Sequence, residues 1–212
     1  MKKIILITAV ALFSVFAFAA ETNSTPQQIE ANYTAAIEGR TADILKVLAL
    51  TDADKAAKVH DTIMAQYRAL KVWHDENDAK LKASAKDTNA IAQIRASLKT
   101  VHDAFIARLS ESLAPSQVGQ VKDKMTYNKV KVTYDAYCEI IPTLTDAQKA
   151  HILETLKAAR EEAMDGGSAD EKSAIFKKFK GRIANYLSKE GVDETKARKE
   201  WGAKQKDKAA AK

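Results

Sequence analysis

Three histidine–aspartate pairs are the residues of this 212-residue chain whose types suggest metal binding. Neighbouring side chains on a helix point about 100° apart, so each pair is poorly placed to chelate one ion. His74 and Asp78 do share a helix face, and His102 would come third from across an antiparallel hairpin. With a turn over 82–86, His74 and His102 would be offset by about 10 Å along the axes of the two helices. We therefore interpret these side chains as solvated and polar, and we expect no metal site and no cofactor. The three pairs are His60-Asp61, His74-Asp75 and His102-Asp103.

Signatures of hydrolases and of nucleotide-binding enzymes do not occur in the sequence. It contains no Gly-x-Ser-x-Gly elbow, no His-Glu-x-x-His motif and no glycine-rich phosphate loop with lysine. Adjacent acids such as Glu161-Glu162 are common on helix surfaces, and a catalytic pair needs a cleft that shifts its pKa values. The sequence thus predicts no catalytic residues. We favour a non-catalytic protein and keep an enzyme as an open alternative.

One flank of a helix near the C-terminus is the best candidate for a binding surface. Lys178, Arg182 and Asn185 line the apolar stripe that contains Phe179. Gly181 lies opposite this stripe, where alanine would favour the helix by about 1 kcal/mol. Either a ligand approaches the backbone closely there, or the cost is tolerated.

Aromatic and amide side chains accompany this flank and recur once elsewhere in the chain. They can stack on sugar rings and form hydrogen bonds with them, but they suit a helix interface equally well. The predicted ligand-binding set is Lys178, Gly181, Arg182, Asn185, Tyr186, Tyr127 and Asn128.

The first twenty residues are typical of an export signal. Lys2 and Lys3 precede an apolar run over 4–16 and a small-x-small cleavage site over 17–19. We expect residues 1–20 to be removed, which leaves a periplasmic or secreted protein with no membrane segment.

The mature chain is long enough for a single domain with a substantial core. We expect a helical domain over 21–203 and a basic, disordered tail over 204–212. Cys138 is the only cysteine, so no intramolecular disulfide can form. We interpret Cys138 as a small apolar residue packed on a helix rather than as a reactive thiol.

Most of the positive charge lies at the C-terminus. The formal net charge is +6, and the segment from Lys196 onward holds seven Lys or Arg residues against two acids. The part between the export signal and this segment is close to neutral, whereas nucleic-acid binding needs a basic stripe on a folded face. We therefore expect no nucleic-acid partner.

Helix-start signals and apolar stripes recur along the whole chain. Thr25 and Pro26 start a helix that we expect to break near Gly39, and a long helix over about 53–81 follows. The next helices start at Asp87 or Thr88 and at Pro115, and Asp193 caps a last helix through Trp201. The segment 127–141 alternates like a strand in part, but no second strand is available to pair with it, so we predict a helix.

The clearest prediction is the helical hairpin from Leu144 to Gly191. Thr145 and Gln148 form a capping box, and the first helix stops at Asp165-Gly166-Gly167, where glycine can take the left-handed C′ position. Ser168 to Glu171 is a second capping box. Together these patterns predict an all-α fold: a single domain of stacked antiparallel helical hairpins.

Several segments resemble the family called domain of unknown function 3826. The resemblance covers most of the mature chain and implies an exported bacterial helical protein that binds sugar; it carries over no catalytic residues. The segments are Lys122 to Asn128, Val132 to Tyr137, Ala158 to Ser168 and Lys180 to Ser188.

A second resemblance is to periplasmic stress chaperones with Leu-Thr-x-x-Gln repeats. Leu144 to Gln148 fits that repeat, whereas Leu50 to Asp54 lacks the glutamine and Leu113 to Gln117 lacks the threonine.

These observations favour an exported, non-catalytic binding protein whose ligand is a carbohydrate. The alternative is a periplasmic chaperone-like or protein-interaction helical bundle, with another exported protein as its partner. A sugar-binding protein needs a polar groove with aromatic side chains. A chaperone needs a broad apolar patch, and an enzyme needs a deep pocket with converging acids.

Overall fold

The computed structural model describes residues 25–210, which form eight α-helices and no strand. The predicted all-α single domain is confirmed. The proposed export signal over 1–20 lies outside the described residues, and no helix within them is long and apolar enough to cross a membrane. The helices are α1 (Pro26–Leu48), α2 (Ala53–Ala83), α3 (Thr88–Ser110), α4 (Pro115–Met125), α5 (Lys129–Ile140), α6 (Asp146–Ala163), α7 (Ala169–Lys189) and α8 (Glu194–Ala210).

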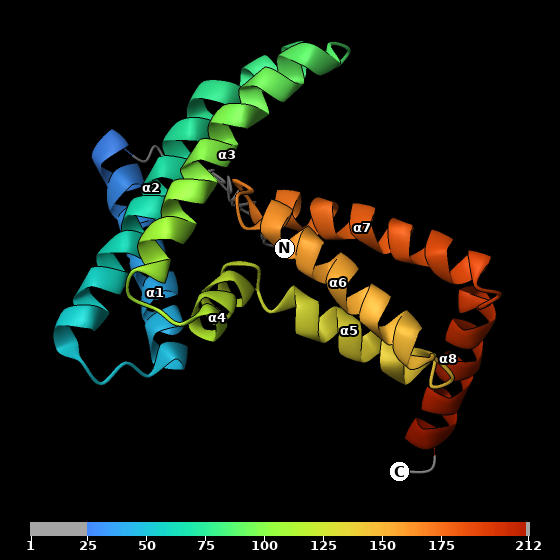
Figure 1. Ribbon diagram of the computed structural model, residues 1–212. Coiled ribbons are helices and arrows are strands. Elements are labelled where there is room, and N and C mark those ends of the chain that lie inside the picture. Colours follow the sequence, from blue (N-terminus) through green and yellow to red (C-terminus); the bar gives the residue numbers. More distant parts are fainter. Residues whose placement is uncertain (1–24, 211–212) are drawn as a thin grey trace, which may run out of the picture.

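The domain contains two hydrophobic cores, one in each half of the chain (Figure 1). In the first half, α2 and α3 form a long antiparallel hairpin, and α1 packs on α2 and α4. In the second half, α6 and α7 form the other hairpin, α5 packs on α6, and α8 lies across the far ends of α5 and α7. Met164, at the end of α6, belongs to the core of the first half. The end of the α6–α7 hairpin therefore inserts into the opposite half of the domain.

Helix α1 does not break at Gly39, so that prediction is wrong. Its buried side chains Ile37, Thr41, Ile44 and Leu48 keep a spacing of three or four residues across the glycine. Burial of this continuous stripe against α2 and α4 outweighs the weak helix propensity of one glycine.

The α6–α7 hairpin has its predicted start but a different turn. Thr145 and Gln148 form the capping box. The cap residue Met164 is right-handed, with φ −65°, and Gly191 is the only glycine with positive φ in the described part of the chain. The prediction of a left-handed glycine after α6 is therefore wrong.

The start of α7 also differs from the predicted capping box. The Ser168 hydroxyl accepts the N–H of Glu171 as expected. The Glu171 carboxylate accepts the N–H of Gly167 at 2.8 Å, rather than that of Ser168. The glutamate thus fixes the turn before the helix.

The predicted helix over 127–141 is confirmed as α5, and the last helix is longer than expected. Tyr127 and Asn128, between α4 and α5, are both left-handed, with φ 58° and 54°. Helix α8 continues to Ala210, past both Trp201 and the boundary that we expected at 203.

Candidate functional site

Asp165, in the turn between α6 and α7, binds two histidines from the α2–α3 hairpin. His102 Nδ1 donates to Asp165 Oδ2 at 2.8 Å. His74 Nε2 donates to the main-chain oxygen of Asp165, also at 2.8 Å. His74 precedes Asp165 by 91 residues in the sequence, and His102 precedes it by 63. This contact joins the two halves of the domain, and we call it the Asp165 junction.

Both histidines are withdrawn from solvent, so their interpretation as solvated side chains is wrong. The side chain of His74 is 8% exposed and that of His102 is 17% exposed. Their common partner, Asp165, lies in a turn far along the chain. The sequence pattern around the histidines therefore could not predict the contact. Their ring nitrogens face hydrogen-bond acceptors, and among the described residues no three His, Cys, Asp or Glu side chains are placed to hold a metal ion.

The hydrogen bonds of His74 favour its charged form. Nδ1 lies 2.9 Å from Asp78 Oδ1, while Nε2 faces a main-chain carbonyl. Both partners only accept, so both ring nitrogens carry a proton when the two bonds are made. Burial acts to lower the pKa of His74, but the bonds to Asp165 and Asp78 outweigh it and raise the pKa above its usual value. The bond to Asp165 likewise raises the pKa of His102.

Gly167 is required by the close approach of His74. A Cβ atom at this position would lie 2.8, 2.9 and 3.0 Å from three atoms of the His74 ring. The imidazole thus packs directly on the glycine backbone. The turn sequence Asp165-Gly166-Gly167 is explained by this contact and not by a left-handed helix end.

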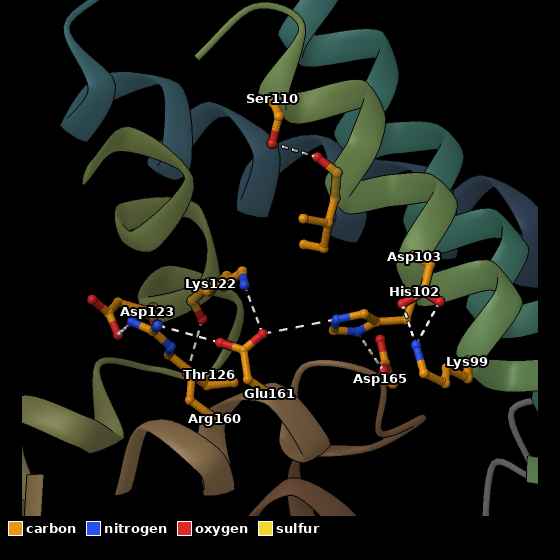
Figure 2. A network of polar contacts seen from close by, with 11 residues as sticks. Lys99, His102, Asp103, Ser110, Lys122, Asp123, Thr126, Arg160, Glu161 and Asp165 are labelled. Atoms are coloured by element: carbon orange, nitrogen blue, oxygen red, sulfur yellow. Dashed lines mark hydrogen bonds and ion pairs between the residues drawn. The ribbon is translucent and has the colours of Figure 1, made fainter. Parts of the chain in front are cut away.

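A chain of alternating charges extends from His102 to α4. Figure 2 shows Glu161 between Lys122 and His102. Lys122 Nζ lies 2.6 Å from Glu161 Oε2, and His102 Nε2 lies 3.8 Å from the same oxygen. Arg160 continues the chain to Asp123 at 2.8 Å. These half-buried pairs attach α4 and α3 to α6.

A cavity of about 630 Å³ opens beside His102 and includes Asp165 in its wall. We call it the His102 pocket. Its apolar wall includes Trp73, Leu98 and Ile175. Four of its five acids pair with neighbouring cations: Asp103 with Lys99, Glu161 with Lys122, Glu162 with Lys178, and Asp165 with His102. The fifth, Glu171, accepts the N–H of Gly167. The acids therefore converge, but in ion pairs.

A second hollow also borders the α6–α7 turn. It consists of two cavities, of about 340 and 220 Å³, that share Arg40, Tyr67, Tyr127 and Lys172. We call the two together the tyrosine groove. Its tyrosines are Tyr33, Tyr67 and Tyr127, and its Lys and Arg side chains are Arg40, Lys71, Lys124 and Lys172.

The tyrosines of the groove are held at different depths. The Tyr33 hydroxyl donates to the main-chain oxygen of Tyr67 at 2.6 Å. Tyr67 is buried, which raises the pKa of its hydroxyl to about 12. Tyr127 is 46% exposed. It lies in the turn between α4 and α5, has a left-handed backbone conformation and lines both cavities. The groove therefore combines a fixed tyrosine floor with one accessible ring.

Lys172 is the buried cation of the groove. Its residue surface is 6% exposed, and Nζ donates to the main-chain oxygens of Met125 at 3.1 Å and Met164 at 3.2 Å. Burial, followed by the charge of Arg40, lowers the pKa of Lys172 to about 8. Lys172 precedes Phe176 by four residues on the buried stripe of α7. A lysine at a core position was thus a signal in the sequence, and we missed it.

The predicted ligand-binding residues lie in three places. Tyr127 and Asn128 line the tyrosine groove. Lys178 lines the His102 pocket and binds Glu162 at 2.9 Å. The other four, on α7, line neither cavity: Gly181 and Asn185 are exposed, Arg182 lies 4.2 Å from the centre of the Phe179 ring, and the Tyr186 ring stacks on His151 at 3.7 Å.

A family model described as "Protein of unknown function (DUF3826)" matches residues 34–207. The match includes the Asp165 junction, the His102 pocket and most of the tyrosine groove. No curated protein matches the chain.

We predict that Gly167→Ala destabilises the protein, whereas Gly181→Ala stabilises it. The new methyl group at 167 must displace the His74 ring, and we expect the free energy of unfolding to fall by about 1–3 kcal/mol. Nothing lies within 4 Å of a Cβ at Gly181, so the matched change there should add about 0.5–1 kcal/mol. Urea unfolding of both variants measures the difference. Equal effects at the two positions would contradict the close packing at Gly167.

We predict that His102→Gln destabilises the protein more in acid than in alkali. The pKa of His102 is higher in the folded protein than in the unfolded chain, where it is about 6.5. Its contribution is therefore complete below about pH 6.5 and is lost as the pH rises through the folded pKa. We expect a loss of about 1.5–3 kcal/mol near pH 5.5 and a smaller loss near pH 9.

Thermal unfolding of wild type, His102→Gln, Asp165→Asn and the double variant over this pH range provides the measurement. The two single changes should be strongly non-additive, because they remove the same hydrogen bond. A His102→Gln loss that stays constant or grows toward alkaline pH would refute the assignment of this bond.

Proposed function

The chain belongs to the DUF3826 family of proteins of unknown function, and we propose that it is a non-catalytic protein that binds a carbohydrate in the tyrosine groove. We also propose that it acts after export, in the periplasm or as a secreted protein. Export rests on the sequence pattern of residues 1–20 alone.

The observation that carries the proposal is the conformation of Tyr127. A bulky residue with positive φ is a backbone outlier and costs of order 1–3 kcal/mol. This residue nevertheless holds a half-exposed ring at the edge of a groove. Such strain is concentrated at binding and active sites, and an exposed aromatic ring can pack against the apolar face of a sugar.

The rest of the groove supplies the polar groups that a sugar requires. Asn128, Arg40 and Lys172 line the same cavity as Tyr127. An amide both donates and accepts, and the two cations donate. A few fixed polar groups beside aromatic side chains are typical of small-molecule sites.

The acids of the domain favour binding over catalysis. Converging acids occur in the His102 pocket, where Asp103, Glu161 and Glu162 are held by lysines. The Glu161 and Glu162 pairs attach α6 to α4 and to α7, whereas Asp103 and Lys99 lie four residues apart on α3.

We predict that Tyr127→Ala weakens carbohydrate binding by about tenfold or more, which corresponds to a loss of about 1.4 kcal/mol. A glycan array identifies the ligand, and isothermal titration calorimetry measures its affinity. Tyr127 is half-exposed, so the variant should remain folded. Tyr186→Ala is the matched control, because Tyr186 belongs to the predicted set but lies outside the groove.

Two results would contradict the proposal. The first is the absence of any glycan that binds at millimolar concentration. The second is a loss of binding in Tyr186→Ala but not in Tyr127→Ala, which would place the sugar on α7.

A further inference from the structure

We propose that the tyrosine groove contains an anion subsite, formed by Arg40 and Lys172, that binds the negatively charged group of an acidic sugar. This inference rests on the proposed function for the sugar, but the anion subsite can be tested independently of it.

Lys172 is a buried cation whose contacts are neutral. Two of the three N–H donors of its ammonium bind main-chain oxygens. Among the described residues it forms no salt bridge. Burying a charge without an opposite charge is costly, and the lowered pKa of Lys172 reflects that cost. An anion in the groove would supply the missing charge and accept the remaining N–H.

Arg40, on α1, places a second positive charge close to Lys172. Its charge contributes to the lowering of the Lys172 pKa, so the two cations repel each other. The guanidinium lies 5.9 Å from the centre of the Tyr67 ring and forms no salt bridge with a described residue. A single anion between Arg40 and Lys172 would turn this repulsion into two attractions.

Most of the carboxylates near the groove already have partners. Asp75 pairs with Lys71, and Asp78 with His74. Asp165 and Glu171 act to raise the pKa of Lys172; Asp165 Oδ2 binds His102 and Glu171 Oε2 accepts the N–H of Gly167, while Asp165 Oδ1 is buried without a hydrogen-bond partner among the described residues.

Two further charged side chains of the groove, besides Arg40 and Lys172, have no described ion pair. Asp43 is exposed on α1, three residues beyond Arg40. Lys124, on α4, lines the same cavity and adds a third cation to Arg40 and Lys172. The uncompensated charge of this cavity is therefore positive.

The geometry favours a carboxylate, sulfate or phosphate group on a sugar. The planar fork of arginine matches two oxygens of such a group, and a lysine ammonium binds them as a compact charge. Tyr67 and Tyr127 line both cavities together with these cations. An acidic sugar would thus place its charged group at Arg40 and Lys172 and its ring beside the tyrosines.

We predict that the protein binds a uronate trisaccharide at least about tenfold more tightly than its uncharged methyl ester, a difference of about 1.4 kcal/mol. Calorimetry with the two ligands isolates the charge, because the sugar is otherwise the same. Glucose 6-sulfate and glucose 6-phosphate, in parallel titrations, distinguish the kinds of anion. Arg40→Gln should abolish the preference for the acid, because it weakens binding of the acid more than binding of the ester.

Two further variants sharpen this test. Arg108→Gln is the matched control: it removes the same charge from an exposed site on α3 that does not line the groove, and it should retain the preference. Asp43→Asn removes a negative charge from the cavity and should strengthen binding of the acid. Arg40 is exposed, so its replacement should not prevent folding.

Proton uptake provides a second readout at Lys172. An anion bound beside the ammonium raises its pKa, so binding near pH 8 should take up as much as about half a proton. Titrations in two buffers of different ionisation enthalpy measure this uptake. The methyl ester should cause none.

The outcomes separate this inference from the proposed function. Equal affinity for the acid and its ester, or an unchanged preference in Arg40→Gln, overturns the anion subsite while sugar binding stands. Binding of inorganic sulfate that depends on Arg40, with no affinity for any sugar, supports the subsite and overturns carbohydrate binding. No binding of sulfate or of any sugar overturns both.

Discussion

The packing of the α6–α7 turn against α2 and α3 is the contact on which the rest of the structure depends. Asp165 makes it with two different groups, its carboxylate toward His102 and its main-chain oxygen toward His74. Gly167 permits the approach because it has no side chain where the His74 ring lies. Met164, immediately before Asp165, packs in the core of the opposite half. Two four-helix halves thereby become one domain.

The tyrosine groove is a consequence of this packing. Its walls come from α1 and α2 in one half, from the α4–α5 turn, and from the start of α7 in the other half. Lys172 binds the main-chain oxygens of Met125 and Met164, one at the end of α4 and one after α6. Lys172 thus helps to hold the two halves together and also lines a cavity. A single side chain connects the stability of the domain to the charge of its groove.

Local sequence patterns predicted much of the fold and only part of the site. Capping residues and apolar stripes located the α6–α7 hairpin because both signals lie within a few residues. The prediction of a helix break at Gly39 was wrong because burial of the apolar stripe outweighs the weak helix propensity of one glycine. Tyr127 and Asn128 were chosen for their chemistry. Arg40 and Lys172 were not predicted, because they line one cavity although 132 residues of sequence separate them, and no periodicity indicates such a neighbourhood.

A crystal structure of the protein with a bound uronate trisaccharide tests the account most directly. We expect one carboxylate within hydrogen-bonding distance of both the Arg40 guanidinium and Lys172 Nζ, with a sugar ring against Tyr127. A trisaccharide bound on the exposed flank of α7 around Gly181 and Asn185, or in the His102 pocket, would contradict the account.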